Sequence, residues 1–142
     1  MAMAMWARDR LYLAVLCGGA PTDDEWSRWV ALGVRRNGQQ QRVLIESRGG
    51  GPTAKQRQAI LSANKADVRI AVMTDSTVVR GIVTAVAWFG VALRAVPLNR
   101  FEAAATYLEL TPEELATAID MFPKLRLEAS INDTAQRPAA PD

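Results

Sequence analysis

The chain has 142 residues, of which 49% are apolar, and it carries 17 Lys and Arg against 15 Asp and Glu. A chain of this length and apolar content buries the core of one domain without a metal or disulfide. The charges are nearly balanced and the basic residues are scattered, which excludes nucleic acid as an expected partner. The sequence has no histidine, and this excludes Ser-His-Asp and Cys-His catalysis and zinc sites with histidine ligands.

Cysteine content and hydropathy predict the compartment. Cys17 is the single cysteine, so an internal disulfide is impossible and a reducing compartment is expected. The longest apolar stretch, residues 78–93, is interrupted by Arg80 and Gly90, and the first residues lack the pattern of a secretory signal. We therefore expect a cytoplasmic protein with no membrane segment.

The first predicted elements are a strand and a helix. Residues 11–16 form a short apolar run stopped by glycines, which is typical of a strand buried on both faces. Thr22 and Glu25 stand at the spacing of a capping box, so a helix begins there. Trp26 and Trp29 follow at helical spacing, and we expect both to face the core.

A second strand and helix follow. The strand is predicted over residues 43–45, and a glycine-rich turn then leads to a second capping box at residues 53–56. That helix is expected to turn Ile60 and Leu61 inward. A third strand is predicted over residues 68–73.

The third helix is expected to begin at an Asp75 or Ser76 cap and to run to Trp88. A fourth strand is predicted over residues 92–96. The next helix has one apolar face, made by Phe101, Ala104, Ala105 and Leu108.

The fifth helix has the strongest start. Thr111 and Glu114 form a capping box with Pro at the first helical position. We expect Pro123 to end or bend this helix. Periodicity is lost after that, so residues 130–142 are predicted to be a disordered tail.

Strand and helix alternate four times, which predicts the α/β class. Crossover connections of this kind make strands parallel. We predict a four-stranded, mostly parallel sheet with alternating helices and an extra C-terminal helix, all within one domain of residues 1–129.

The stretch IAVMTDSTVVRGIVTAVAWFG followed by LRAVPLNRFEAAATYLEL resembles the small bacterial domains of the STAS superfamily, which are anti-sigma-factor antagonist-like and related in fold to CRAL-TRIO lipid-binding domains. The likeness covers residues 43–110 and includes the last-helix pattern met by Phe101, Ala105, Tyr107 and Leu108. It implies a curled sheet backed by helices and a role in binding proteins rather than in converting substrates.

The regulatory members of that superfamily carry a phosphorylatable serine in a turn after the central strand. Here the turn after the second strand is Ser47-Arg48-Gly49-Gly50-Gly51, which does not match that pattern. The resemblance therefore does not extend to a phosphorylation switch.

One candidate site lies where the strands end. Ligands of open parallel sheets bind outside the carboxyl ends of the strands, and glycines let backbone amides approach an anion. A small anionic or lipid-like ligand could bind the residues Ser47, Gly49, Gly50, Gly51, Thr53, Asp75 and Ser76. The alternatives are a flexible turn for the glycines and helix capping for Asp75 and Ser76.

Cys17 raises a third possibility, an enzyme. Its thiolate, or the carboxylates of Asp23, Asp24 and Asp75 with Mg²⁺, would then carry the chemistry. The alternative is that Cys17 is a small buried apolar residue.

The third helix is apolar around more of its circumference than one core stripe requires. Either the fifth helix with Phe122 covers its second face, or that face is a homodimer or partner surface. The surface would consist of Arg80, Thr84, Trp88 and Phe89.

We predict a non-enzymatic protein-interaction or regulatory module without cofactor or metal. It would act by binding a protein partner or by self-association as a homo-oligomer. The binder of a small anionic or lipid-like ligand is the alternative function.

Overall fold

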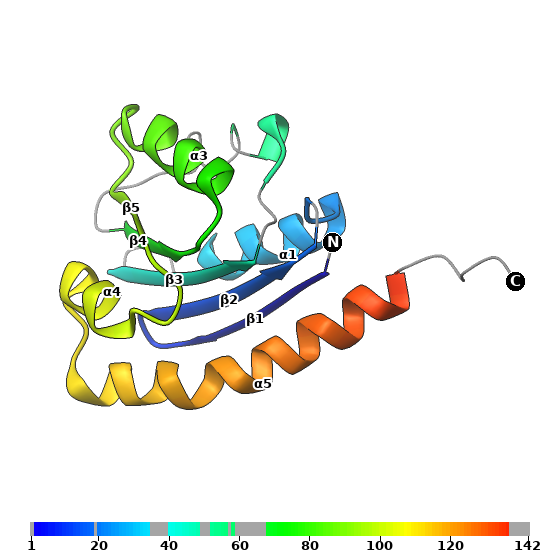
Figure 1. Ribbon diagram of the computed structural model, residues 1–142. Coiled ribbons are helices and arrows are strands. Elements are labelled where there is room, and N and C mark those ends of the chain that lie inside the picture. The colour runs from blue at the N-terminus through cyan, green and yellow to red at the C-terminus, as the bar shows by residue number, and fades with distance from the viewer. Residues whose placement is uncertain are drawn as a thin grey trace, which may run out of the picture.

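The computed structural model describes residues 2–18, 20–34, 40–48, 52–56, 58 and 68–136. Its strands form one sheet in the order β1-β2-β3-β4-β5, with helices on both sides (Figure 1). The strands are β1 (Ala2–Arg8), β2 (Leu11–Cys17), β3 (Gln41–Arg48), β4 (Val68–Met73) and β5 (Leu93–Val96). The described helices are α1 (Asp23–Val34), α3 (Thr77–Ala87), α4 (Phe101–Leu108) and α5 (Pro112–Gln136).

The α/β class and the mostly parallel sheet are confirmed, but the prediction of four strands is wrong. β2, β3, β4 and β5 pair in parallel, and β1 adds a fifth strand antiparallel to β2. A two-residue turn joins β1 to β2, with Asp9 at φ 51°. Sequence patterning missed β1 because it alternates Ala with Met, which are not strong strand formers, so pairing with β2 decides its conformation.

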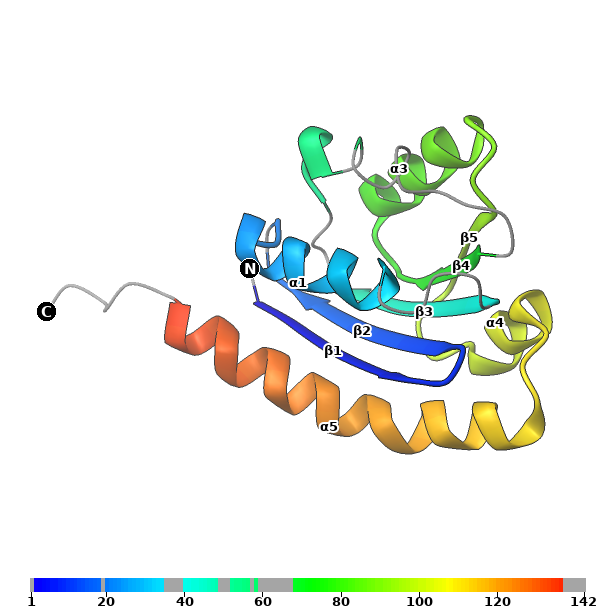
Figure 2. The same cartoon turned by 180° about the vertical axis from the view of Figure 1, so that it is seen from behind.

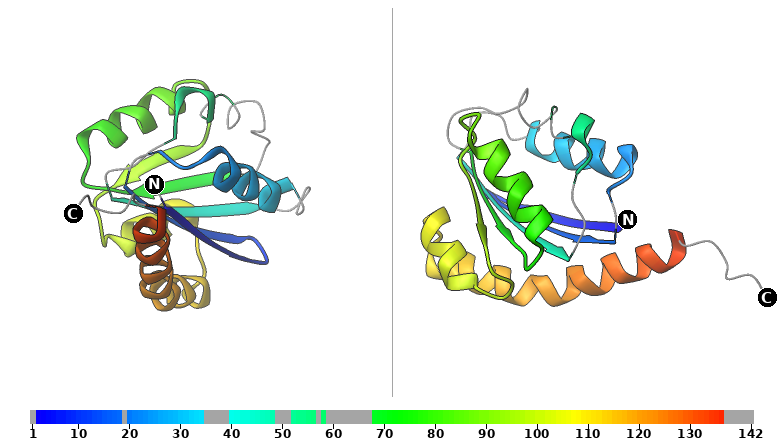
Figure 3. Two further views of the ribbon diagram at one scale, coloured as in Figure 1. Left: turned by 90° about the vertical axis from the view of Figure 1, so that its right-hand side faces the viewer. Right: turned by 45° about the horizontal axis from the view of Figure 1, so that its top comes forward.

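The position of β2 in the sheet explains why its sequence is a continuous apolar run. Successive side chains of a strand point to opposite faces of the sheet, and helices cover both faces of this one. Alternate residues Leu11, Leu13 and Val15 join the core on the side of α4 and α5, whereas Ala14 and Leu16 lie on the α1 side. Figure 3 (left) shows α1 and α3 on one side of the sheet and α5 on the other, and Figure 2 shows α1 from its own side.

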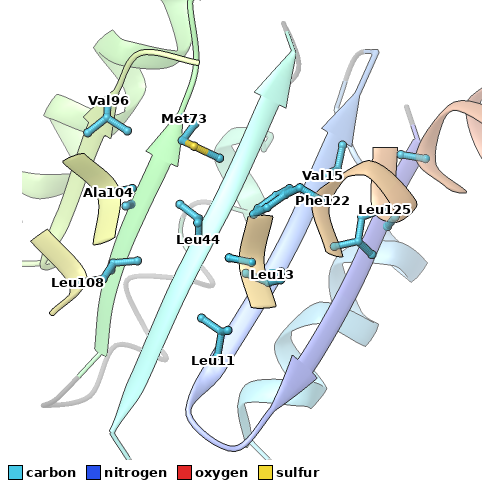
Figure 4. Close-up of a cluster of buried hydrophobic side chains, with 14 residues drawn as sticks. Leu11, Leu13, Val15, Leu44, Met73, Val96, Ala104, Leu108, Phe122 and Leu125 are labelled. Atoms are coloured by element: carbon cyan, nitrogen blue, oxygen red, sulfur yellow. The ribbon is translucent and has the colours of Figure 1, made fainter. Parts of the chain in front are cut away.

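The larger core lies between the sheet and helices α4 and α5 (Figure 4). Phe122 of α5 is fully buried and lies 5.5 Å from Phe101 of α4, measured between ring centroids. Leu13, Leu44 and Met73 meet these helices from three neighbouring strands. This packing holds α5 against the β1–β2 end of the sheet.

All three predicted capping boxes are present. Thr22 and Glu25 exchange hydrogen bonds between backbone N–H and side-chain oxygen, as do Thr53 with Gln56 and Thr111 with Glu114. Glu25 has a second task, because its other carboxylate oxygen accepts the backbone N–H of Met3 at 2.9 Å. The start of α1 therefore holds the first part of β1.

The C-terminal helix is longer than predicted. Pro123 does not end α5, which continues to Gln136, so the prediction of a disordered tail is wrong for residues 130–136. The proline removes one hydrogen bond, but Leu125 and Ala129 beyond it are buried against the sheet. Among the described residues the helix runs as far as Gln136.

Several predictions fall outside the described residues. These are the inward placement of Ile60 and Leu61, the glycine turn at residues 49–51, and the last part of the tail, residues 137–142. Within the described part of the chain, no helix has the length and apolar content that crossing a membrane requires.

An ion pair joins the start of α5 to the β1–β2 turn. Arg10 donates from Nε and Nη2 to the two oxygens of Glu114 at 2.8 and 2.7 Å, and Nη2 also donates to the Glu109 carbonyl. The hydrogen bonds from Arg10 to Glu114, helped by the Thr111 amide and opposed by partial burial, lower the pKa of Glu114 to about 2. A carboxyl group whose pKa is lowered by folding stabilises the fold when the pH is above the ordinary pKa of that group.

This pair predicts an acid dependence of stability. The contribution of Glu114 is complete above its ordinary value of 4.5 and disappears as the pH falls toward about 2. Replacing Arg10 with Met should lower the free energy of unfolding by about 1 kcal/mol at neutral pH and flatten its slope between these two pH values. Urea unfolding at a series of pH values measures both effects.

The matched control is Arg28→Met, which breaks an exposed pair with Asp24. This variant should keep the acid slope of the wild type. An equal flattening in both variants would contradict the assignment to Glu114.

Candidate functional site

Three of the polar residues predicted at the carboxyl ends of the strands form hydrogen bonds with the protein's own backbone. Thr53 caps a helix start, and Ser76 Oγ accepts the Val79 N–H at 3.3 Å as the cap of α3. Asp75 accepts the Leu98 N–H, also at 3.3 Å, and so ties the start of α3 to the loop after β5. Capping and turn formation therefore account for the presence of these three residues.

The remaining residues of that predicted ligand site do not form a group in the described structure. Ser47 is buried, and Gly49, Gly50 and Gly51 lie outside the described residues. Cys17 is partly buried at the margin of the larger core. Across the described residues, no three Cys, Asp or Glu side chains come together as metal ligands, and binding of an anionic or lipid-like ligand here stays a prediction.

The residues predicted as an interface lie together on α3 and the turn after it. Trp88 is 85% exposed and Phe89 75% exposed, and Val78 one helix length away is 73% exposed. Arg80 and Thr84 are also exposed. We call these five residues the α3 surface.

The exposure of the α3 surface follows from how α3 packs. Val79 and Val83 face the sheet and meet Val72 of β4. α3 thereby buries a single stripe, made by Val79, Val83 and Val86, whereas Val78 is exposed. The predicted cover by the fifth helix and Phe122 is wrong, because α5 packs on the opposite face of the sheet, where Phe122 is buried.

Small residues lie between the large side chains of the α3 surface. Gly81 and Ala85 are exposed between Val78 and the two aromatic side chains, and a Cβ placed on Gly81 would meet no atom within 4 Å. The turn after Ala87, with Gly90 at φ 89°, ends the helix and leaves Trp88 and Phe89 at its margin. The result is an apolar stripe with a shallow centre and large side chains at both ends.

The tryptophan pair of α1 differs from the aromatic residues after α3. Trp26 is buried, and Trp29 is half-buried with its ring edge-on to Tyr12 at 6.4 Å. The prediction that both face the core is confirmed, so the aromatic residues of α1 do not add to an exposed surface.

Sequence reasoning missed a buried ionic cluster. Glu46 of β3 has no exposed surface, and Arg126 of α5 donates to both of its oxygens from Nε at 2.9 Å and to one from Nη2 at 2.7 Å. Arg48 adds a third donor at 3.1 Å. A glutamate inside the apolar strand VLIES was the available indication, since a buried charge requires a partner.

The cluster should contribute strongly to stability. Replacing Arg126 with Met leaves Glu46 buried with Arg48 alone, so we expect the free energy of unfolding to fall by about 3 kcal/mol. Replacing Glu46 with Leu in the same chain removes the isolated charge and should restore most of that loss. Chemical denaturation of the single and double variants measures both steps.

Lys124→Met is the control for that series. Lys124 lies two residues from Arg126, and its pair with Asp120 is long, at 4.0 Å, and exposed. We expect a change below about 0.5 kcal/mol. A loss in the control as large as that of Arg126→Met would contradict the special role of the buried pair.

No protein-family model matches the chain, and no curated protein or solved structure matches it either. The resemblance to STAS domains therefore stays a prediction from sequence.

Proposed function

We infer that this protein is a non-enzymatic interaction module that binds a protein partner through the α3 surface. The observation that carries this proposal is the exposure of two adjacent aromatic side chains, Trp88 at 85% and Phe89 at 75%. Contiguous exposed apolar surface on a soluble domain marks interaction sites. Trp and Arg are also the residue types that dominate the energy of protein interfaces.

The chemistry of the surface favours a partner with a helix or an extended apolar segment. The exposed Gly81 and Ala85 allow a partner's backbone to approach closely, and Val78 and Phe89 would then flank it. Arg80 supplies one positive charge beside the stripe, which suits an acidic group on the partner.

One feature of the sequence and one of the structure support a binding role over catalysis. The chain has no histidine, the residue most often used for general acid–base chemistry. In the structure, Thr53, Asp75 and Ser76 of the carboxyl edge cap helices or bond to loop backbone. The likeness to STAS domains agrees with this proposal.

The proposal predicts position-specific capture of a partner. A photoreactive phenylalanine analogue placed at Trp88 should form a covalent adduct of defined mass in cells, because Trp88 is expected to be buried by the partner. The same analogue at Leu127, an α5 residue that is 64% exposed, is the matched control. Adding Arg80→Glu to the chain should abolish the adduct at position 88, and circular dichroism should show an unchanged fold.

The outcome of this experiment distinguishes specific binding at α3 from non-specific association. Adducts of the same pattern from positions 88 and 127 would contradict the proposal, as would the absence of an adduct at position 88. An adduct whose mass equals two chains would identify self-association as the mode of binding.

A further inference from the structure

The outer edge of β1 is open for pairing. β1 is the end strand of the sheet, and the N–H of Met3 points outward, because it bonds to Glu25 rather than to β2. Backbone groups of an antiparallel strand alternate between its two sides. The outward groups of Met5 and Ala7 therefore lie at an edge where no further strand follows among the described residues.

From Met5 to Ala7 this edge lacks the features that normally prevent pairing. Proteins protect edge strands with prolines, inward-pointing charges, bulges or very short strands. β1 has seven residues, six of them apolar, and no proline. The opposite edge, β5, has only four residues and is followed directly by Pro97.

We propose that β1 pairs antiparallel with β1 of a second copy of this chain across a two-fold axis, joining the two sheets into one. The placement of α5 supports a second copy as the occupant. α5 packs over β1 and β2 together, and strands in a sheet are about 4.8 Å apart. The two α5 axes would therefore lie two strand spacings apart, about 10 Å, which is the distance at which helices pack.

The flank of α5 that would face the second copy is self-complementary. Arg126 reaches toward β3, so the opposite flank of the helix lies on the side of the β1 edge. That flank carries the half-buried Met121 and the exposed Lys124 and Glu128. A two-fold axis runs the two helices antiparallel, so the basic and acidic side chains of this flank would face the same flank of the second copy.

The capped amide of Met3 selects the register. Because Glu25 occupies that amide, the available pairing joins Met5 of one copy with Ala7 of the other, and Ala7 with Met5. Trp6 then lies directly opposite Trp6 of the second copy in a non-hydrogen-bonded pair, where side chains are closest. Trp6 is only half-buried in the single chain, so the pairing would bury it further.

Cysteine cross-linking tests both the pairing and its register. In a chain whose single cysteine, Cys17, is replaced by Ala, Trp6→Cys should form a disulfide-linked dimer on mild oxidation. Arg8→Cys is the matched control, because the two positions 8 would lie four residues, about 13 Å, apart along the strands. Dimer from position 6 and little from position 8 is the expected result, whereas equal yields or none at position 6 would overturn the proposal.

Light scattering coupled to size exclusion tests the hydrogen bonds. Met5→Pro removes an outward N–H that β2 does not use, and proline is tolerated at such edge positions. We expect the wild type and Met5→Ala to have twice the chain mass and Met5→Pro to be a monomer with a native circular dichroism spectrum. A monomeric wild type over the whole concentration series would overturn the proposal.

The proposal for the β1 edge and the proposal for the α3 surface are tested independently of each other. α3 packs over β4 and β5, at the other end of the sheet, so replacing Trp88 should leave the β1 dimer intact. The dimer would carry two α3 surfaces at its far ends and could bind two partners or one two-fold partner more tightly than a single chain.

Discussion

The attachment of α5 to the sheet is the constraint on which the rest of the structure depends. Two ion pairs fix it, Glu114 with Arg10 at the β1–β2 turn and Arg126 with the fully buried Glu46 of β3. Between them, Phe122 fills the larger core. A buried carboxylate without a partner is strongly unfavourable, so Glu46 in effect requires α5 to pack on this face of the sheet.

The position of α5 decides which surfaces remain exposed. Had α5 packed on the opposite face, it would have been available to cover α3, and the aromatic residues after α3 would have a place in the core. Because it covers β1 and β2 instead, α3 keeps a second apolar face in solvent. The same placement leaves the outer edge of β1 beside an α5 flank that has mixed charge, so the two proposed binding surfaces lie at opposite ends of the sheet.

Local signals predicted the elements well. The capping boxes at Thr22, Thr53 and Thr111 depend on residues three apart in the sequence, so neighbouring residues specify them completely. The double-sided burial of β2 was also visible, because only a strand covered on both faces needs consecutive apolar side chains. The elements that the sequence did not predict depend on contacts between distant residues instead. β1 is held by β2 and Glu25, and the last turns of α5 are held by contacts with the sheet beyond Pro123.

The sequence by itself determined the α/β class, the parallel strands, the helix starts and the presence of excess apolar surface on the third helix. Periodicity and capping are local properties, and composition is a property of the whole chain, so neither requires knowledge of the fold. Only the tertiary structure decided that α5 lies across the sheet from α3, that Glu46 meets Arg126 eighty residues away, and that Trp88 and Phe89 are exposed. These depend on which faces meet, and that choice is made by long-range packing and by the requirement that a buried charge find its partner.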